Sequence, residues 1–159
     1  MALLLSLNFL APPPVLAAPR VKKTLTVYDQ QAPITEKELL NFLELLPKFR
    51  SWSHQNHEEA HPKLTKGQPD FLYSEQAATW IKNKGWDVRR FFCVMGKMAA
   101  ALVIVEEGND LKGTRPADMP KVSEAEINLA QRHLAKLLEI GEGQAPKVEV
   151  GTPTLPKRP

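Results

Sequence analysis

The residue types and spacing that most suggest chemistry in this 159-residue chain are those of His57, Glu58 and His61, which match the pattern H-E-x-x-H. On a helix this spacing places two imidazoles one turn apart, where they can bind zinc, and the glutamate between them can activate a zinc-bound water. His54 would lie on the same helical face. The pattern therefore raises the hypothesis of a metal-dependent hydrolase, with His57 and His61 as metal ligands and Glu58 as the base.

The residues around this motif argue against a peptidase. Pro62 directly follows the second histidine, whereas a helix that holds a zinc ligand normally continues past it. Glu59 places a second acid beside the base, and the flanking residues are polar, so this turn is expected in solvent rather than in a cleft. Asp70 and Glu75 are available as third ligands, but neither belongs to a recognisable second motif. We therefore expect a hydrated, polar helix end here. Zinc is expected as a cofactor only if the hydrolase alternative holds.

A basic turn is the second candidate site. Its predicted binding residues are Lys82, Lys84, Trp86, Arg89 and Arg90. Cations beside tryptophans can bind a phosphate, an anionic head group or an acidic protein. The alternative is that Trp80 and Trp86 pack in the core and the basic residues form a solvated rim.

Composition narrows the function classes. Lys and Arg number 21 against 18 Asp and Glu, and this net charge of +3 is too small a surplus for a dedicated nucleic-acid binder. The single cysteine, Cys93, excludes an intramolecular disulfide, and its apolar neighbours predict a buried, inert thiol. The chain has no phosphate-binding glycine loop, no C-x-x-C pair and no nucleophile-elbow serine, so nucleotide, thiol-redox and serine-hydrolase chemistry find no support.

Both ends of the chain predict segments outside the folded domain. Residues 1–18 contain no charge and combine a short apolar run with small residues at its end, which predicts a secretory signal peptide and a periplasmic or secreted product. No Lys or Arg precedes the apolar run, so a disordered apolar N-terminus on a cytoplasmic protein is the alternative. Residues 144–159 are rich in proline and predict a disordered tail. We expect no transmembrane anchor.

The intervening residues 19–143 predict one helical domain. Thr35 with Glu38 and Ser123 with Glu126 are capping boxes, and apolar residues at steps of three and four follow each of them. Pro47 is expected to kink or divide the first of these helices. A shorter helix is expected to begin at Ser74 and to end before Gly85. Between it and the first helix, residues 63–69 are predicted to form a loop.

The segment from Asp87 to about Glu107 is apolar on nearly every side, which predicts a buried central helix. The β-prone run Leu102–Val105 leaves a strand as the competing interpretation. The predicted fold class is therefore all-α: a small helical bundle of four to five helices with a buried central helix and disordered or extended terminal segments.

These observations favour an exported, non-enzymatic helical protein that works by binding another protein or itself. The basic turn adds an anionic ligand as a further possibility. The metal-dependent hydrolase is the alternative, and binding to nucleic acid or to an anionic membrane ranks last because the net charge is small.

Overall fold

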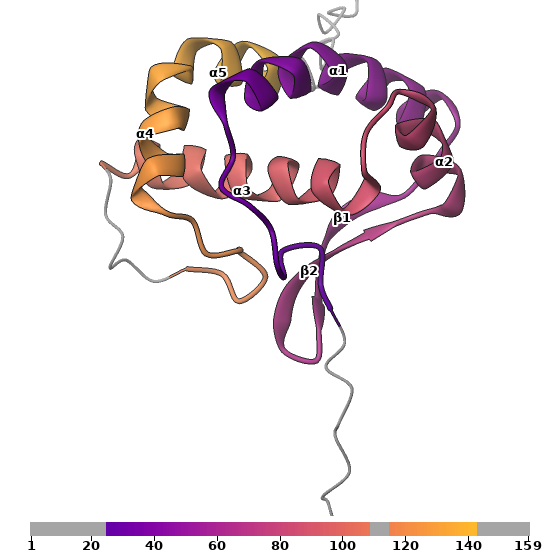
Figure 1. Ribbon diagram of the computed structural model, residues 1–159, viewed down its shortest axis with the longest axis horizontal. Coiled ribbons are helices and arrows are strands. Elements are labelled where there is room, and N and C mark those ends of the chain that lie inside the picture. The colour runs from indigo at the N-terminus through magenta and orange to yellow at the C-terminus, as the bar shows by residue number, and fades with distance from the viewer. Residues whose placement is uncertain (1–24, 109–114, 143–159) are drawn as a thin grey trace, which may run out of the picture.

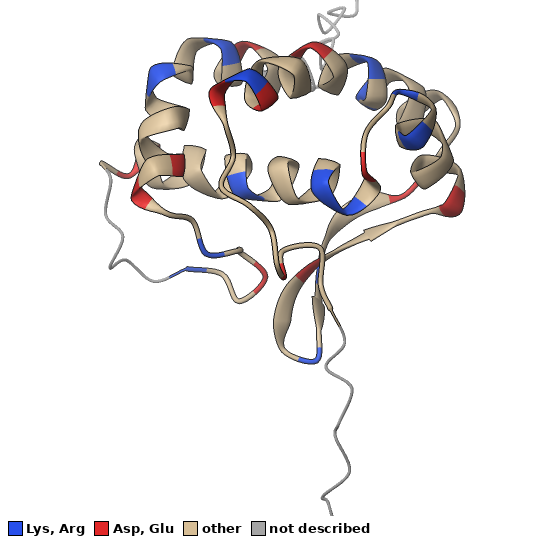
Figure 2. Cartoon of the chain, in the orientation of Figure 1, with Lys and Arg blue, Asp and Glu red and all other residues tan. Residues whose placement is uncertain are grey.

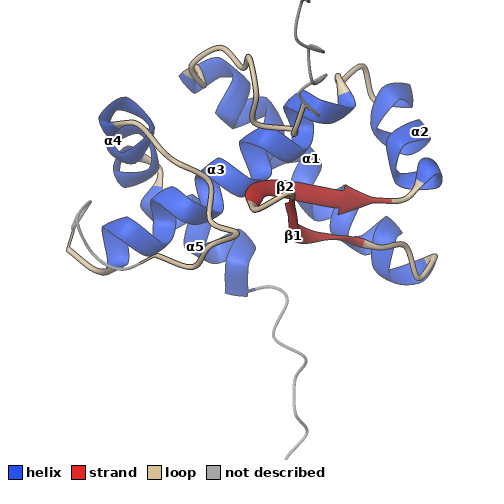
Figure 3. Cartoon of the chain, turned by 90° about the horizontal axis from the view of Figure 1, so that it is seen from below, coloured by secondary structure: helices blue, strands red, loops and turns tan. Residues whose placement is uncertain are grey.

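The computed structural model describes residues 25–108 and 115–142, and Figure 1 shows how their elements are arranged. The predicted signal peptide (1–18) and tail (144–159) lie outside these residues. In chain order the elements of this part are α1 (Glu36–Gln55), β1 (Ala60–Thr65), β2 (Gln68–Tyr73), α2 (Glu75–Asn83), α3 (Val88–Glu106), α4 (Glu124–Arg132) and α5 (Leu134–Glu142). The predominance of helix is confirmed, but the class all-α is wrong, because a two-stranded antiparallel sheet is present (Figure 3).

Two helices begin where the capping boxes predict. The Thr35 hydroxyl accepts a hydrogen bond from the Glu38 N–H at 3.2 Å, and the Glu38 carboxylate accepts one from the Thr35 N–H. Ser123 and Glu126 make the same reciprocal pair at the start of α4. Each box satisfies N–H groups that have no partner within the helix.

Pro47 does not divide α1, which runs without interruption from Glu36 to Gln55. The proline side chain is exposed. Because it lies on the solvent side, the apolar stripe continues past it and is buried at Leu39, Phe42, Leu43, Leu46 and Phe49.

The central helix α3 has ten buried residues and packs against α1, α2 and α4. Figure 1 shows it running beneath α1, with α4 and α5 at one end and α2 at the other. The competing strand over residues 102–105 is wrong, because these residues continue the helix. None of the helices in the described ranges has both the length and the apolar character needed to cross a membrane.

The last predicted helix is divided in two at His133. The N–H of this residue bonds to the carbonyls of Leu129 and Ala130, which tightens the final turn of α4 before α5 begins. The α5 helix lies against α1, where Arg50 Nη1 donates a hydrogen bond of 2.6 Å to the Ile140 carbonyl.

The prediction of a loop over residues 63–69 is wrong, because these residues belong to the β-hairpin that forms the sheet. Lys66 and Gly67 have φ of 51° and 73°, the left-handed backbone of a two-residue hairpin turn. The hairpin is held on α3 by Phe92, whose ring stacks on those of Phe71 and Tyr73 with centroids 4.8 and 4.5 Å apart.

Candidate functional site

The H-E-x-x-H residues do not lie on a helix. Because α1 ends at Gln55, His57 lies beyond the helix with φ of 54°, and His61 belongs to β1. The Glu58 backbone turns back on α1, since its N–H donates to the Ser53 carbonyl and its carbonyl accepts from Ser53 Oγ, both at 2.9 Å. The expectation that this motif forms the polar end of the helix is therefore wrong, because α1 ends before it. The helical geometry on which the zinc hypothesis depended does not occur.

The side chains of the motif also lie in different environments. His61 is exposed, and its Nδ1 lies 3.0 Å from the carbonyl oxygen of the adjacent Pro62. Glu58 and His54 instead line a cavity that is described below. Within residues 25–108 and 115–142, no group of three or more His, Cys, Asp or Glu side chains is arranged to hold a metal ion.

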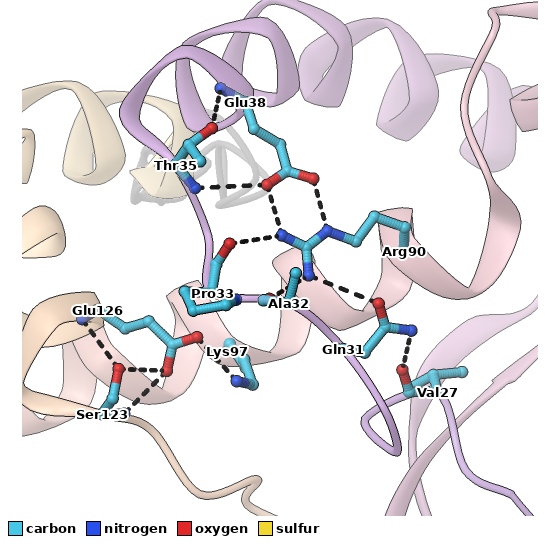
Figure 4. Close-up of polar contacts among 10 residues, drawn as sticks. All are labelled: Val27, Gln31, Ala32, Pro33, Thr35, Glu38, Arg90, Lys97, Ser123 and Glu126. Atoms are coloured by element: carbon cyan, nitrogen blue, oxygen red, sulfur yellow. Dashed lines mark hydrogen bonds and ion pairs between the residues drawn. The ribbon is translucent and has the colours of Figure 1, made fainter.

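Arg90, from the predicted basic turn, is bound to the chain's own N-terminal segment. Its Nε and Nη2 each lie 2.5 Å from an oxygen of the Glu38 carboxylate, as Figure 4 shows. The guanidinium also donates to the carbonyls of Ala32 at 2.6 Å and Pro33 at 3.1 Å. The hydrogen bond to Glu38 raises the pKa of Arg90. Arg90 thus fastens the segment before α1 to the start of α3.

The other basic-turn residues face in different directions. Arg89 donates to the carbonyls of Thr26 at 2.6 Å and Asp29 at 3.1 Å. Trp86 packs against the core through edge contacts with Phe42 and Phe91. Lys82 and Lys84 are exposed at the end of α2, with Lys84 Nζ 5.3 Å from the centre of the Trp80 ring. Figure 2 shows basic and acidic positions mixed over the helices. The five residues therefore do not form one free cationic surface.

A cavity of about 600 Å³ in the described part of the chain is partly open to solvent. It lies between the second half of α1, the hairpin, α3 and the segment 116–120. Its apolar lining comprises Phe49, Ala60, Pro62, Phe71, Met95, Gly96, Ala99, Ala100, Val103, Pro116, Met119 and Pro120. Its polar lining comprises Tyr28, Arg50, Ser53, His54, Glu58 and Asp118. A volume of this size is typical of small-molecule sites.

Small residues of α3 create the hollow. Ala99 and Ala100 lie on the face that lines the cavity, and they leave space that larger side chains would fill, whereas the space beside Gly96 is occupied by the Tyr28 side chain. Met95 and Val103 also belong to the face of α3 that lines the cavity. Methionine at Met95, and at Met119 on the opposite segment, gives the lining flexible side chains that can adapt to a ligand.

Tyr28 is one of the lining residues, and its hydroxyl group is buried and closed to solvent. Its oxygen has no hydrogen-bond partner among the residues that the structure describes. Burial, followed by the neighbouring Cys93, Asp70 and Asp118, raises the pKa of Tyr28, so the hydroxyl stays protonated and can donate. A Cβ at Gly96 would lie 2.9 Å from Tyr28 Cζ and closer still to the hydroxyl oxygen, so α3 needs glycine at this point.

Sequence reasoning missed both Tyr28 and Gly96. The available signal was a lone glycine inside an otherwise apolar helix, which often marks a close approach by another group. By contrast, Cys93 is fully buried as predicted, and burial raises the pKa of its thiol. Comparison of the chain with models of protein families, with curated proteins and with solved structures finds no match.

Proposed function

We propose that this protein is an exported, non-enzymatic binding protein and that the cavity between α1, the hairpin and α3 receives an apolar ligand. The observation that carries the proposal is the cavity itself, which has a volume of about 600 Å³ and a mainly apolar lining. Export is supported by the sequence of residues 1–18.

The lining favours an apolar ligand because it leaves apolar side chains in contact with water. Ala99 and Val103 are exposed on α3, and Met95 and Met119 are half-buried. A ligand that covers these groups removes apolar surface from water, which contributes about 25 cal/mol for each Å².

Two of the polar side chains that line the cavity are engaged in holding the fold, which supports binding rather than catalysis as the role of these two residues. Ser53 Oγ donates to the Glu58 carbonyl, and Arg50 donates to the Ile140 carbonyl. A nucleophile or a general acid must instead be free to contact a substrate. Arg50 also lies in a desolvated position, where burial lowers its pKa.

A binding experiment with naphthalene tests this proposal. Met95 and Met119 line the cavity, whereas Met98 is buried in the core and is not among the lining residues. With ¹³C-methyl-methionine protein, naphthalene is expected to shift the Met95 and Met119 resonances saturably and to leave Met98 in place. Absence of a saturable shift, or equal shifts of all three resonances, would overturn the proposal.

A matched pair of substitutions locates the binding. Ala99 and Ala125 are both exposed helical alanines, but Ala99 lines the cavity and Ala125 is on α4 outside its lining. Ala99→Phe is expected to fill the hollow and abolish naphthalene binding. Ala125→Phe should bind as the wild type does. Equal affinities of the two variants would show that the probe binds elsewhere, which contradicts the proposal.

A further inference from the structure

We infer that an open groove beside Trp52 and Trp80 binds an uncharged sugar, whose ring lies against the two tryptophans. The groove lies between the end of α1 and the exposed face of α2 and has a volume of about 440 Å³. This groove, called the tryptophan groove below, is lined by Trp52, Glu75, Gln76, Thr79, Trp80 and Asn83. None of these residues lines the cavity of the proposed function, so the inference stands independently of it.

The two tryptophans supply apolar surface to the tryptophan groove. Their rings stack with centroids 5.5 Å apart and 25° between their planes. The buried Phe49 packs against both rings, at 6.1 Å from Trp52 and 5.5 Å from Trp80, and holds them in place. Both tryptophans are only half-buried, so part of each ring is in contact with water. A ligand that covers these rings removes apolar surface from water.

Polar side chains of α2 form the rest of the lining, and all of them are exposed. The Glu75 carboxylate and the amides of Gln76 and Asn83 make no hydrogen bond or ion pair with the residues that the structure describes. Thr79 Oγ1 donates to the Glu75 carbonyl at 2.9 Å, and its oxygen can still accept a hydrogen bond. The tryptophan groove therefore offers a ligand both donors and acceptors, at atoms that solvent reaches.

The helix arranges these polar groups along one side of the tryptophan groove. Gln76, Thr79 and Asn83 follow one another at steps of three and four, so they share a face of α2. Seven residues of helix rise about 10 Å, which is longer than a single sugar ring. The amides of Gln76 and Asn83 can thus meet hydroxyl groups of neighbouring rings in a short oligosaccharide.

A sugar matches this combination of surfaces. A pyranose ring with equatorial hydroxyl groups carries C–H groups on its two faces and hydroxyl groups around its edge. The faces can pack on the tryptophan rings, while the hydroxyl groups both donate and accept hydrogen bonds. Glu75 contributes a negative charge to the lining, and Lys84 Nζ lies 5.3 Å from the centre of the Trp80 ring. Charges of both signs therefore border the tryptophan groove, which favours an uncharged ligand.

A proline-rich peptide is the rival ligand, because such peptides also bind grooves that are lined by aromatic rings. Proline has no backbone N–H, so these peptides present mainly carbonyl acceptors. The Glu75 carboxylate is itself an acceptor and gains no hydrogen bond from a carbonyl, whereas a sugar hydroxyl can donate to it. The lining thus favours the sugar over the peptide.

Fluorine NMR of protein labelled with 5-fluorotryptophan tests the inference, since the chain has three tryptophans. Trp86 is an internal control, because it packs on Phe42 and Phe91 and does not belong to the lining. Cellotriose is expected to shift the Trp52 and Trp80 resonances saturably and to leave Trp86 in place. Sorbitol, which has hydroxyl groups but no ring, should shift none of them. The absence of a saturable shift with cellotriose, or equal shifts with sorbitol, would overturn the inference.

Two asparagines provide a matched pair of variants. Asn83 and Asn128 are both exposed on helices, but Asn83 lines the tryptophan groove and Asn128 is on α4 outside its lining. Asn83→Ala should weaken cellotriose binding about 5-fold, as the loss of one net hydrogen bond predicts. Asn128→Ala should bind cellotriose as the wild type does. Equal affinities of the two variants would contradict the role of the tryptophan groove.

The outcomes also separate this inference from the proposed function and from the rival ligand. Cellotriose should leave the Met95 and Met119 resonances in place, because these residues line the other cavity. Shifts of these methionines in place of the tryptophans would locate the sugar in that cavity and overturn the inference. A synthetic peptide with the proline-rich sequence of residues 144–159 is the competing probe. Tighter binding of this peptide than of cellotriose at Trp52 and Trp80 would overturn the preference for a sugar.

Discussion

The hydroxyl of Tyr28 lies against the backbone of α3 at Gly96, in the space where any other side chain would begin. The tyrosine belongs to the segment before α1, and the glycine lies near the middle of α3. Their contact joins two distant parts of the sequence, and both residues line the cavity.

This contact predicts that the effect of Gly96→Ala depends on residue 28. Within a helix, alanine is more favourable than glycine by about 1 kcal/mol. A Cβ at residue 96 would collide with the tyrosine ring, however, so we expect a net destabilisation of about 1–3 kcal/mol. In a Tyr28→Ala background the ring is absent, and Gly96→Ala should become stabilising by up to about 1 kcal/mol. Urea denaturation of the four proteins measures both effects. The same effect in both backgrounds would contradict the contact.

A second prediction concerns the partly buried pair of Lys97 and Glu126, which joins α3 to α4. Lys97 Nζ donates to Glu126 Oε1, as Figure 4 shows, at a distance of 2.7 Å. The glutamate residue is only 2% exposed. Burial alone would raise the pKa of Glu126, but the hydrogen bond and charge of Lys97, together with hydrogen bonds from Ser123, lower it below its ordinary value of 4.5.

The sign of the pH dependence follows from this lowered pKa. A carboxyl group with a lower pKa in the folded state stabilises the fold above its unfolded pKa and loses this contribution as the pH falls through the folded value. Wild type should therefore exceed Glu126→Gln in free energy of unfolding at about pH 7, and the difference should shrink below about pH 4.5. The exposed Glu124→Gln, in the first turn of the same helix, is the control. A pH-independent difference for Glu126→Gln would contradict the pKa direction.

A third prediction concerns Arg90, because its guanidinium joins Glu38 and two carbonyls to α3. The side chains of Arg90 and Glu38 are 15% and 22% exposed, so solvent screens the pair less than it would a surface pair. In Arg90→Lys the side chain cannot make the bidentate contact with the Glu38 carboxylate, so the free energy of unfolding should fall by about 2 kcal/mol. The exposed Lys84→Met loses a cation–π contact and should cost less than about 1 kcal/mol. Equal costs in urea denaturation would contradict this role of Arg90.

The elements that the sequence predicts well are those set by neighbouring residues. Thr35 with Glu38 and Ser123 with Glu126 define helix starts within four residues, and the structure confirms both. The partner of Arg90 could not be predicted in the same way, because the positive charge is visible in the sequence but the position of Glu38 beside it depends on the packing of α1 on α3.

Long-range packing also explains why the hairpin and the cavity were missed. Pro62 and Pro69 argue against a strand in a large sheet, but a two-stranded sheet has two edges, where a missing N–H can face away from the partner. The cavity is lined by residues from distant parts of the chain, such as Tyr28 and Gly96, and no local pattern links these positions.

The turn of the hairpin gives the last prediction. Gly67 has φ of 73°, which any residue with a Cβ adopts at a cost, so Gly67→Ala should destabilise the protein by about 1 kcal/mol. Gly141 in α5 has open space around it and a helical backbone, so Gly141→Ala should leave stability unchanged or raise it by up to about 1 kcal/mol. Urea denaturation compares the two variants. Since β2 carries Phe71 into both the core and the cavity lining, loosening the turn should also weaken naphthalene binding, whereas Gly141→Ala should not. A neutral Gly67→Ala would show that the left-handed turn is not required for the hairpin.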